Sequence, residues 1–320
     1  MDGRALPHPL TVAFYASEVH FADHLLPLYR ALPPERQGPF IMPGEPVKGR
    51  YMHRSVVVAG YGDLKNSRRW FPMARRALLQ HGSGQSYWGT TRGRGHPSYS
   101  GGADHYDVSL FLCPNEFSAS KWRQVYPKAN VAVVGSPKVS TLPTTAPAEP
   151  TVAVSFHWQC GLLEETKSAY PAFRLAYQTL AERWPVVGHA HPRAQRMVKP
   201  MALRAKVPWY EQFADVCAAA SVYVCDNSST LFEFAATGKP VVLLNAPGYR
   251  KDVDHGMRFW ELATMGPQVD HIRDLAGAVE FALADPATQR AERERVVDLV
   301  YPVRAGSSEL AAAAVQEWAR

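Results

Sequence analysis

Short apolar runs alternate with helix-forming segments along most of the chain, and this alternation limits its possible folds more than any other feature. In the first half, helical periodicity covers residues 20–32 and 115–126, and apolar runs occur at 11–16, 55–60, 77–80, 108–112 and 130–135. Strands that alternate with helices form parallel sheets, because each helix returns the chain to the same edge. The first half is therefore predicted to be a doubly wound α/β domain.

The alternation resumes after a segment rich in proline, threonine and alanine. Residues 136–150 contain few large apolar side chains, which is typical of an interdomain linker. Beyond this segment, strands are predicted at 151–156, 185–189, 221–225 and 240–245, and helices at 167–183, 209–220 and 230–237. The second half is thus predicted to be another doubly wound sheet.

These patterns predict two Rossmann-like domains that face a central cleft. We expect the first domain over residues 1–140, a linker over 141–150 and the second domain over 151–305. A helix over 306–320 is expected to pack back on the first domain. In such sheets ligands bind beyond the carboxyl ends of the strands.

Composition excludes several classes of protein. The 320 residues are 46% hydrophobic, which is enough for two cores, and no run of eighteen apolar residues could span a bilayer. The N-terminus lacks the apolar core of a signal peptide, so we expect a cytoplasmic protein. The four cysteines are scattered, which argues against disulfides or a zinc ribbon and predicts buried free thiols. The net charge of +6 favours phosphates, nucleic acid or the inner membrane face as partners, without selecting among them.

The clearest polar pattern lies within residues 224–240. A strand is predicted to end at Asp226, and a helix should begin a few residues later. Three hydroxyl side chains lie at that junction: Ser228, Ser229 and Thr230. Free N–H groups and the helix dipole favour an anion there, so a diphosphate could bind without a metal. The alternative interpretation is that Thr230 and Glu233 form only a capping box, and both interpretations can hold at once.

A second cluster follows the strand predicted at 185–189. His189, His191 and Arg193 stand at its carboxyl end. An imidazole there can donate to a departing phosphate, and a guanidinium can neutralise its charge. The His-x-His spacing also suits zinc, but no third ligand lies at a recognisable spacing. Alternatively, each histidine simply packs at a strand end. Two further side chains at a strand end are expected to face the cleft, with no role assigned: Ser155 and His157.

His81 is the candidate proton acceptor of the first half. It follows the apolar run at 77–80 and is followed by Gly82, Ser83, Gly84 and Gln85. Glycines let the backbone approach a ligand closely, and imidazole has an ordinary pKa near neutrality. His81 could therefore take a proton from an attacking hydroxyl, although a simple turn histidine is the alternative. These glycines spell neither a dinucleotide fingerprint nor a Walker loop, which argues against NAD and ATP.

Two loops are candidate acceptor contacts or lids. Residues 89–102 are too polar and glycine-rich for a core element. Four side chains of these loops are candidates: Arg92, Arg94, Tyr249 and Arg250. Asp252 and Asp254 have a spacing that can hold Mg²⁺, but such coincidences are frequent, so we expect a solvated loop and no metal. No serine elbow, Cys–His pair or paired-carboxylate motif supports a hydrolase.

Four segments resemble the CDP-glycerol glycerophosphotransferase family, teichoic-acid polymerases and primases with the GT-B fold. CDNSSTLFEFAATGKPVVLLN is similar to the family's D-x-S-S signature, and QHGSGQ, VVGSPK and HAHPR are similar to its acceptor-side, interdomain and His-Pro segments. The resemblance covers residues 80 to 260. The chain departs from the pattern in Gly-Ser-Gly after His81 and in Lys138, where the family usually has Gly-Thr-Pro and arginine.

The resemblance implies roles for particular residues. His81 would be the general base on the acceptor hydroxyl, and His191 and Arg193 would lie at the donor diphosphate. The nucleotide end would be formed by Asp226, Ser228 and Ser229. We therefore expect a cofactor-free, metal-independent GT-B transferase that moves glycerophosphate or a sugar from a nucleotide-diphosphate donor to an acceptor hydroxyl.

Two alternatives remain open. The first is a transferase that modifies a polymer such as hydroxylated DNA or a surface polysaccharide, in which case the arginines of the glycine-rich loop would guide a polyanion. The second is a non-catalytic nucleotide-binding protein that retains the fold.

Overall fold

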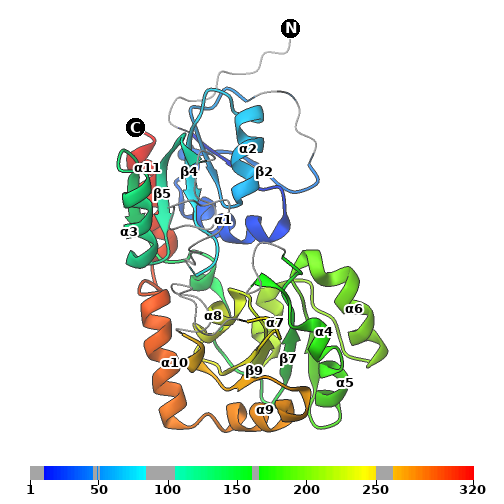
Figure 1. The fold of residues 1–320 in the computed structure, drawn as a ribbon. Coiled ribbons are helices and arrows are strands. Elements are labelled where there is room, and N and C mark those ends of the chain that lie inside the picture. Colours follow the sequence, from blue (N-terminus) through cyan, green and yellow to red (C-terminus); the bar gives the residue numbers. More distant parts are fainter. Residues whose placement is uncertain (1–10, 46–48, 50, 84–104, 161–165, 250–261) are drawn as a thin grey trace. The chain divides into compact units, whose positions relative to one another are not determined.

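The computed structural model describes residues 11–45, 49, 51–83, 105–160, 166–249 and 262–320. The chain divides into two compact units (Figure 1): Met1–Thr141 with Tyr301–Arg320, and Leu142–Val300. Each unit is built on a parallel sheet covered by helices, as the alternation predicts. The end of the chain returns to the first unit.

The first unit contains a six-stranded parallel sheet. Its strands are β1 (Val12–Tyr15), β2 (Gln37–Ile41), β3 (Ser55–Val58), β4 (Arg75–Leu79), β5 (Val108–Cys113) and β6 (Asn130–Val133). They lie in the order β2-β1-β3-β4-β5-β6. No strand is predicted from the sequence at β2, because Gly38 and Pro39 interrupt its apolar pattern; proline is tolerated here because β2 is an edge strand.

Helices cover both faces of this sheet because successive side chains of a strand point to opposite faces. The helices are α1 (Val19–Ala31), α2 (Tyr61–Trp70), α3 (Glu116–Val125) and α11 (Ser307–Trp318). Phe14 of β1 packs in the cluster that includes α1 and α11. Its neighbours Ala13 and Tyr15 pack in the cluster that includes α2 and α3. The C-terminal helix is therefore part of the core of the first unit.

The second unit contains a five-stranded parallel sheet. Its strands are β7 (Val152–Ser155), β8 (Val186–Gly188), β9 (Val222–Cys225), β10 (Val241–Leu244) and β11 (Gln268–Val269). They lie in the order β11-β10-β9-β7-β8. Its helices are α4 (Tyr170–Phe173), α5 (Ala176–Ala181), α6 (Gln195–Arg204), α7 (Phe213–Ala219), α8 (Thr230–Ala235), α9 (Leu275–Ala284) and α10 (Ala287–Val300).

Two helical predictions for the second unit need correction. The helix predicted at 167–183 is two short helices, α4 and α5, separated by Arg174 and Leu175. Helix α6 is not predicted from the sequence, because Pro192 and Pro200 indicate breaks. Here Pro192 opens a single 3-10 turn and Pro200 lies within the helix, whose apolar side is buried.

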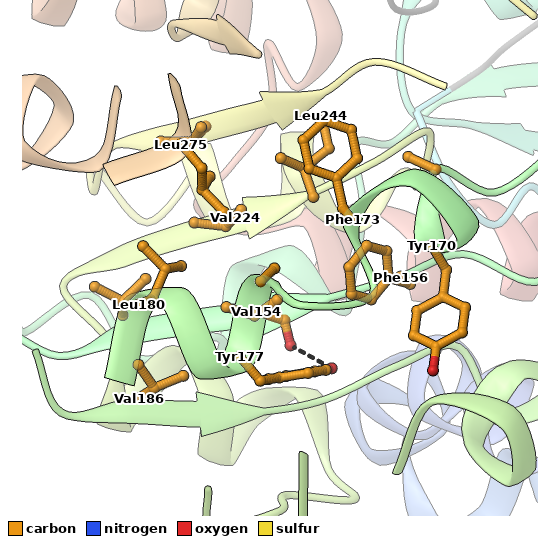
Figure 2. Packing of buried hydrophobic residues seen from close by; sticks show 14 of the residues in the cluster. Val154, Phe156, Tyr170, Phe173, Tyr177, Leu180, Val186, Val224, Leu244 and Leu275 are labelled. Carbon is orange, nitrogen blue, oxygen red and sulfur yellow. Dashed lines mark hydrogen bonds between the residues drawn. The ribbon is translucent and has the colours of Figure 1, made fainter. Parts of the chain in front are cut away.

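The core of the second unit supports the polar edge of its sheet. Figure 2 shows Val154, Val224 and Leu244 of three strands packed together with helical side chains. Among them, the buried Tyr177 donates its hydroxyl hydrogen toward Val154 O and His189 O, each 3.3 Å away. A buried hydroxyl needs such partners. The Tyr177 hydroxyl therefore links the backbone at the ends of β7 and β8.

Both sheets have the same kind of switch point. In each, the first strand lies between the second and third strands, so the connections on its two sides run in opposite directions. A crevice forms at the carboxyl ends of the strands where this happens, and ligands bind there in open α/β sheets. The switch points lie between β1 and β3 in the first unit and between β7 and β9 in the second.

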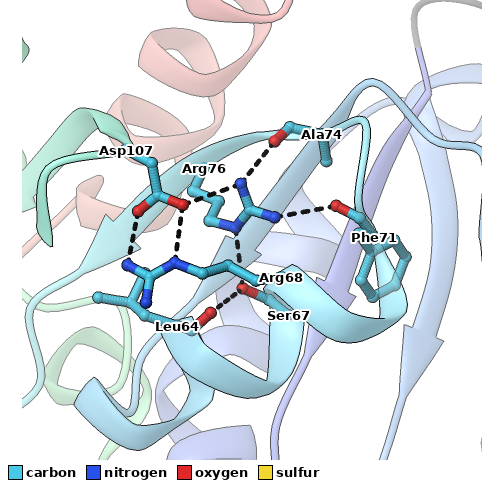
Figure 3. A network of polar contacts seen from close by, with 7 residues as sticks. All are labelled: Leu64, Ser67, Arg68, Phe71, Ala74, Arg76 and Asp107. Carbon is cyan, nitrogen blue, oxygen red and sulfur yellow. Dashed lines mark hydrogen bonds and ion pairs between the residues drawn. The ribbon is translucent and has the colours of Figure 1, made fainter. Parts of the chain in front are cut away.

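An arginine network lies at the amino ends of the strands of the first sheet, opposite to the carboxyl ends where ligands bind (Figure 3). Arg76 of β4 is buried, donates to Ser67 Oγ at 3.2 Å and Phe71 O at 3.0 Å, and pairs with Asp107 at 3.1 Å. Arg68 makes a second ion pair with Asp107 at 2.8 Å. The network joins α2 to the beginning of β4 and to the residue preceding β5. It is structural, because it lies away from the carboxyl ends of the strands.

Candidate active site

His81 lies just beyond the end of β4, next to the residues that follow β3. Its Nδ1 is 2.7 Å from Ala59 O. A carbonyl oxygen can only accept, so Nδ1 carries the hydrogen, and in the neutral ring Nε2 carries the lone pair. The backbone of the neighbouring strand thus selects the tautomer that a general base requires.

Aromatic rings from the switch point hold the His81 ring. Phe21 of α1 and Tyr61 of α2 each have ring centroids 5.0 Å from that of His81. The His24 ring lies 6.1 Å away and is buried. Burial, followed by the charges of Lys138, His81 and His20, lowers the pKa of His24 well below its usual value, so His24 is neutral at pH 7. His81 therefore lies among mainly uncharged rings.

Helix α3 holds the segment on both sides of His81. Gln80 Oε1 accepts from Trp122 Nε1 at 3.0 Å, and Ser83 O accepts from Asn115 Nδ2 at 3.1 Å. Gly82 has φ +82°, a conformation that favours glycine. Ser83, predicted as an acceptor contact, is fully buried and supports the turn instead. The remaining predicted contacts of these loops lie outside the described residues: Gly84, Gln85, Arg92, Arg94 and Arg250.

A buried carboxyl group that was not predicted from the sequence lies at the same switch point. Asp63, in the first turn of α2, accepts from Ser17 N at 3.3 Å. It therefore connects the turn after β1 to the turn after β3. Burial raises the pKa of Asp63 to about 6. The sequence contained one signal that could have identified it: Asp63 lies three residues after Gly60, which ends the strand predicted at 55–60.

In the second unit, Asp226 is a buried carboxylate that holds the segments around the switch point together. Its carboxylate accepts from His157 N at 2.7 Å, Ser168 Oγ at 2.7 Å and Ala169 N at 2.8 Å. It is buried, and this burial raises its pKa to about 6 although the hydrogen bonds oppose the shift. The structure thus gives Asp226 a different position from the predicted direct nucleotide contact. It connects the loop after β7 to the end of β9.

The start of α8 also differs from the prediction. Ser228 is only 7% exposed, and its Oγ accepts from Thr230 Oγ1 at 2.8 Å. The N-cap residue is Ser229, without a side-chain capping bond, so the capping box of Thr230 and Glu233, which was the alternative interpretation, does not form. Glu233 is buried, which removes it as a direct donor contact. Ser229 and Thr230 are partly exposed and remain the candidate hydroxyl contacts.

His191, His157 and Trp158 meet at the carboxyl ends of β7 and β8. The ring centroids of His157 and His191 are 5.2 Å apart, and the Arg193 guanidinium lies 5.0 Å from the Trp158 ring centroid. His191 Nδ1 accepts from Arg193 N at 3.2 Å, so in the neutral ring Nε2 carries the hydrogen. His191 can therefore donate a hydrogen bond to an anion.

His157 is held neutral beside these residues. Burial lowers the pKa of His157 to about 4. Its Nδ1 is buried, and among the residues that the structure describes it has no hydrogen-bond partner. Buried polar atoms usually have a hydrogen-bond partner. A ligand bound at the candidate donor site could supply that partner for His157 Nδ1.

Three other predicted contacts point into the protein. His189 is buried, with Nδ1 3.0 Å from Ser155 Oγ and its ring against Phe213. Ser155 is also buried, so this pair supports the strand ends rather than facing a ligand. Tyr249 packs against the core of the second unit, and its hydroxyl is buried.

The described part of the chain contains no cluster of His, Cys, Asp or Glu side chains that could hold a metal ion. Asp252 and Asp254 lie outside it. The four cysteines are free and buried, as predicted.

Two parallel α/β units with polar side chains at their switch points have the architecture of GT-B transferases. The sequence places the chain more narrowly. It belongs to the CDP-glycerol:poly(glycerophosphate) glycerophosphotransferase family, whose profile matches residues 80–311. The protein is therefore a transferase, and the resemblance noted in the sequence is confirmed.

Solved structures share the fold at low sequence identity. The wall teichoic acid polymerase TagF, in a variant soaked with CDPG, has a TM-score of 0.67 at 11% identity, over 98% of this chain and 89% of that one. A protein described as a UDP-N-acetylglucosamine 2-epimerase, from Listeria monocytogenes, has a TM-score of 0.59 at 11% identity, over 93% and 94%. S. aureus MnaA with UDP has a TM-score of 0.59 at 12% identity, over 93% and 94%. No curated protein matches the chain.

Proposed function

We propose that this transferase moves glycerophosphate, or a sugar, from a nucleotide-diphosphate donor to an acceptor hydroxyl in the cytoplasm, without a metal ion or cofactor. The family description supports CDP-glycerol as the donor. The observation that carries the proposal is the hydrogen bond from His81 Nδ1 to Ala59 O, because it leaves Nε2 as the proton acceptor.

In the proposed reaction, His81 Nε2 takes the proton of the acceptor hydroxyl as its oxygen attacks the donor. For a CDP-glycerol donor, the new bond joins that oxygen to the phosphorus that carries glycerol. The bond from this phosphorus to the bridging oxygen breaks, and CMP leaves. General-base assistance of this kind typically contributes about 10²–10⁴-fold in rate.

The donor phosphates are proposed to bind at the switch point of the second unit. His191 Nε2–H and the Arg193 guanidinium would stabilise the negative charge of the leaving group. The partly exposed hydroxyls of Ser229 and Thr230 would add hydrogen bonds. Asp226 would act indirectly, by holding the backbone of His157.

The proposal is tested with His81→Ala. We expect the turnover of CDP-glycerol to fall by about 10²–10⁴-fold, while the donor affinity measured by calorimetry stays close to that of the wild type. His271→Ala is the matched control, because His271 is an exposed histidine outside both switch points. If His81→Ala lost donor affinity by as large a factor as it lost turnover, or kept its turnover, the role of His81 as general base would be contradicted.

A polymeric acceptor is the second candidate within the same function. The family description names a poly(glycerophosphate), and the chain carries a net charge of +6. A polyanionic acceptor would be bound less tightly as salt screens its phosphates. An acceptor KM that does not rise with ionic strength would instead favour a small neutral acceptor.

A further inference from the structure

A fully buried tyrosine of β9 has its hydroxyl group beside the candidate phosphate site. The Tyr223 ring stacks on Phe234 of α8, with centroids 5.1 Å apart, and meets Phe213 of α7 edge to face at 5.7 Å. Its hydroxyl oxygen lies 2.9 Å from Thr230 Oγ1. Burial raises the pKa of Tyr223 well above its usual value, so the phenol keeps its hydrogen at pH 7. Apolar packing explains the ring, and the hydroxyl group requires a reason of its own.

The Tyr223 hydroxyl begins a short chain of hydrogen bonds. Thr230 Oγ1 donates to Ser228 Oγ at 2.8 Å, and Thr230 N donates to the same oxygen at 3.3 Å. A threonine hydroxyl has a single hydrogen, and in Thr230 that hydrogen is directed at Ser228. Thr230 Oγ1 can then only accept from Tyr223. The chain therefore runs one way, from Tyr223 through Thr230 to Ser228.

Ser228 ends this chain with a hydrogen to donate. Its oxygen accepts both hydrogen bonds from Thr230, and in the part of the protein that the structure describes its own hydrogen has no acceptor. Ser228 reaches the surface narrowly, and Thr230 is more exposed. A phosphate at that surface can take the hydrogen of Ser228, or that of Thr230 once its hydroxyl turns away from Ser228.

The direction of the chain matters because an ionised phosphate oxygen only accepts hydrogen bonds. Without the Tyr223 hydroxyl, Ser228 can donate to Thr230 instead, and the Ser228 hydrogen is then used inside the protein. The chain also strengthens the bond at its end, because a hydroxyl that accepts a hydrogen bond becomes a stronger donor. The Tyr223 hydroxyl thus favours the arrangement that suits an anion.

We propose that Tyr223 is a positioning residue for the donor phosphates, because its hydroxyl keeps those of Thr230 and Ser228 turned as hydrogen donors toward a phosphate oxygen. Tyr223 is 0% exposed, so it acts through Thr230 and does not touch the ligand. This role rests on the proposed binding of a nucleotide diphosphate at the switch point of the second unit.

Calorimetry with CDP tests the role of the phenol oxygen. Tyr223→Phe removes that oxygen and keeps the ring, so the CDP dissociation constant should rise about threefold to tenfold, the effect of one neutral hydrogen bond. Cytidine has no phosphate, and its binding, followed by saturation-transfer NMR, should be unchanged. A tyrosine needed only for packing would change the binding of both ligands or of neither. The full chain is used, and no helix in its described part is long and apolar enough to cross a membrane.

A double-variant cycle tests whether the effect passes through Thr230. Thr230→Val replaces the hydroxyl with a methyl group and should raise the CDP dissociation constant about 10- to 100-fold, because hydrogen bonds to charged groups are stronger. Adding Tyr223→Phe to Thr230→Val should then change that constant by about twofold or less. Thr230→Ser keeps the hydroxyl and should bind CDP like the wild type.

Tyr170→Phe is the matched control. Tyr170 belongs to the same unit and is 9% exposed, and its hydroxyl donates to Met197 O at 3.3 Å. The loss of this hydroxyl should leave CDP binding unchanged. Circular dichroism melts identify any variant that fails to fold. If Tyr223→Phe fails to fold, Thr230→Val and Thr230→Ser still test the chain.

The possible failures have different meanings. Wild-type protein that does not bind CDP would contradict the proposed function itself. If the wild type binds CDP and folded Tyr223→Phe binds it equally well, the role of Tyr223 is wrong and the proposed function stands. The same holds if the effects of Tyr223→Phe and Thr230→Val add in the cycle, or if Thr230→Val binds CDP like the wild type.

Discussion

At the scale of single residues, the polar groups of both switch points divide into those that can meet a ligand and those that hold them. His81 and His191 each have one ring nitrogen hydrogen-bonded to the backbone. In the neutral rings this bond decides that the other nitrogen accepts a hydrogen in His81 and donates one in His191. Asp63 and Asp226 are buried carboxyl groups that connect two turns each. Both have a raised pKa, so they cost stability in order to fix geometry.

Asp63 should therefore make the stability of the protein depend on pH. Burial raises its native pKa from 3.8 to about 6, so between these values the native state binds more protons than the unfolded state. The contribution of Asp63 is most favourable below about pH 4 and is lost as the pH rises through 6. Asp63→Asn removes this term, so its free energy of unfolding should exceed that of the wild type by about 3 kcal/mol at pH 8.

Denaturant titrations of both proteins at several pH values measure the difference. Near pH 4 the two should have similar stability, because the wild-type carboxyl group is then protonated in the folded protein. Asp226 is present in both and does not affect the comparison. A wild type that is equally or more stable than Asp63→Asn at pH 8 would show that Asp63 is stabilised as a carboxylate.

At the scale of elements, the strands follow closely from the sequence and the short helices do not. Strands such as β9 and β10 are continuous apolar runs, typical of parallel strands buried on both faces. Helix α6 and the break between α4 and α5 depend on what each segment packs against. The turns after the strands are set by backbone contacts, and Gly135 after β6 is the clearest case.

Gly135→Ala should destabilise the first unit more than a glycine conformation alone explains. Gly135 and Gly306 have similar positive φ values, +77° and +73°. A methyl group on Gly135 would collide with the Val303 carbonyl, whereas none of the described atoms lies within 4 Å of one on Gly306. We expect Gly306→Ala to cost about 1 kcal/mol and Gly135→Ala distinctly more. Equal losses in thermal melts would show that the turn relaxes.

At the scale of the whole molecule, the chain leaves the first unit after Thr141 and returns to it at Tyr301. The returning helix α11 contributes Ala311, Val315 and other buried residues to the core of that unit. The first unit is therefore complete only once the second has been synthesised. Its stability should depend on the last twenty residues of the chain.

Trp318→Ala tests this dependence. Trp318 is buried, its Nε1 donates to Ser109 Oγ at 2.9 Å, and Arg75 Nη2 donates to its carbonyl at 2.7 Å. Removing a buried tryptophan side chain typically costs about 3–5 kcal/mol. Hydrogen exchange should show the loss in β5 and α1 of the first unit, with β9 in the second unit unaffected. Uniform loss over both units would mean that the chain unfolds as a single cooperative body.

The candidate site was predictable only in part. His81, His191 and Arg193 stand out because polar residues directly follow apolar runs, and the carboxyl ends of parallel strands carry ligands. The burial of Ser155, His189 and Ser228 was not predictable, since a strand end can turn a side chain either way. Asp63 was not predicted as a site residue, because its partner Ser17 is 46 residues away in the sequence.

Local sequence by itself determined the parallel sheets, the division into two units and the segments that carry the chemistry. Apolar periodicity and residue type act over a few neighbours, so they can be recognised without knowing the fold. The tertiary structure decided which polar atoms remain available, which tautomer His81 adopts and which carboxyl groups brace the turns. These properties depend on contacts between segments far apart in the chain, and on how much water their burial removes.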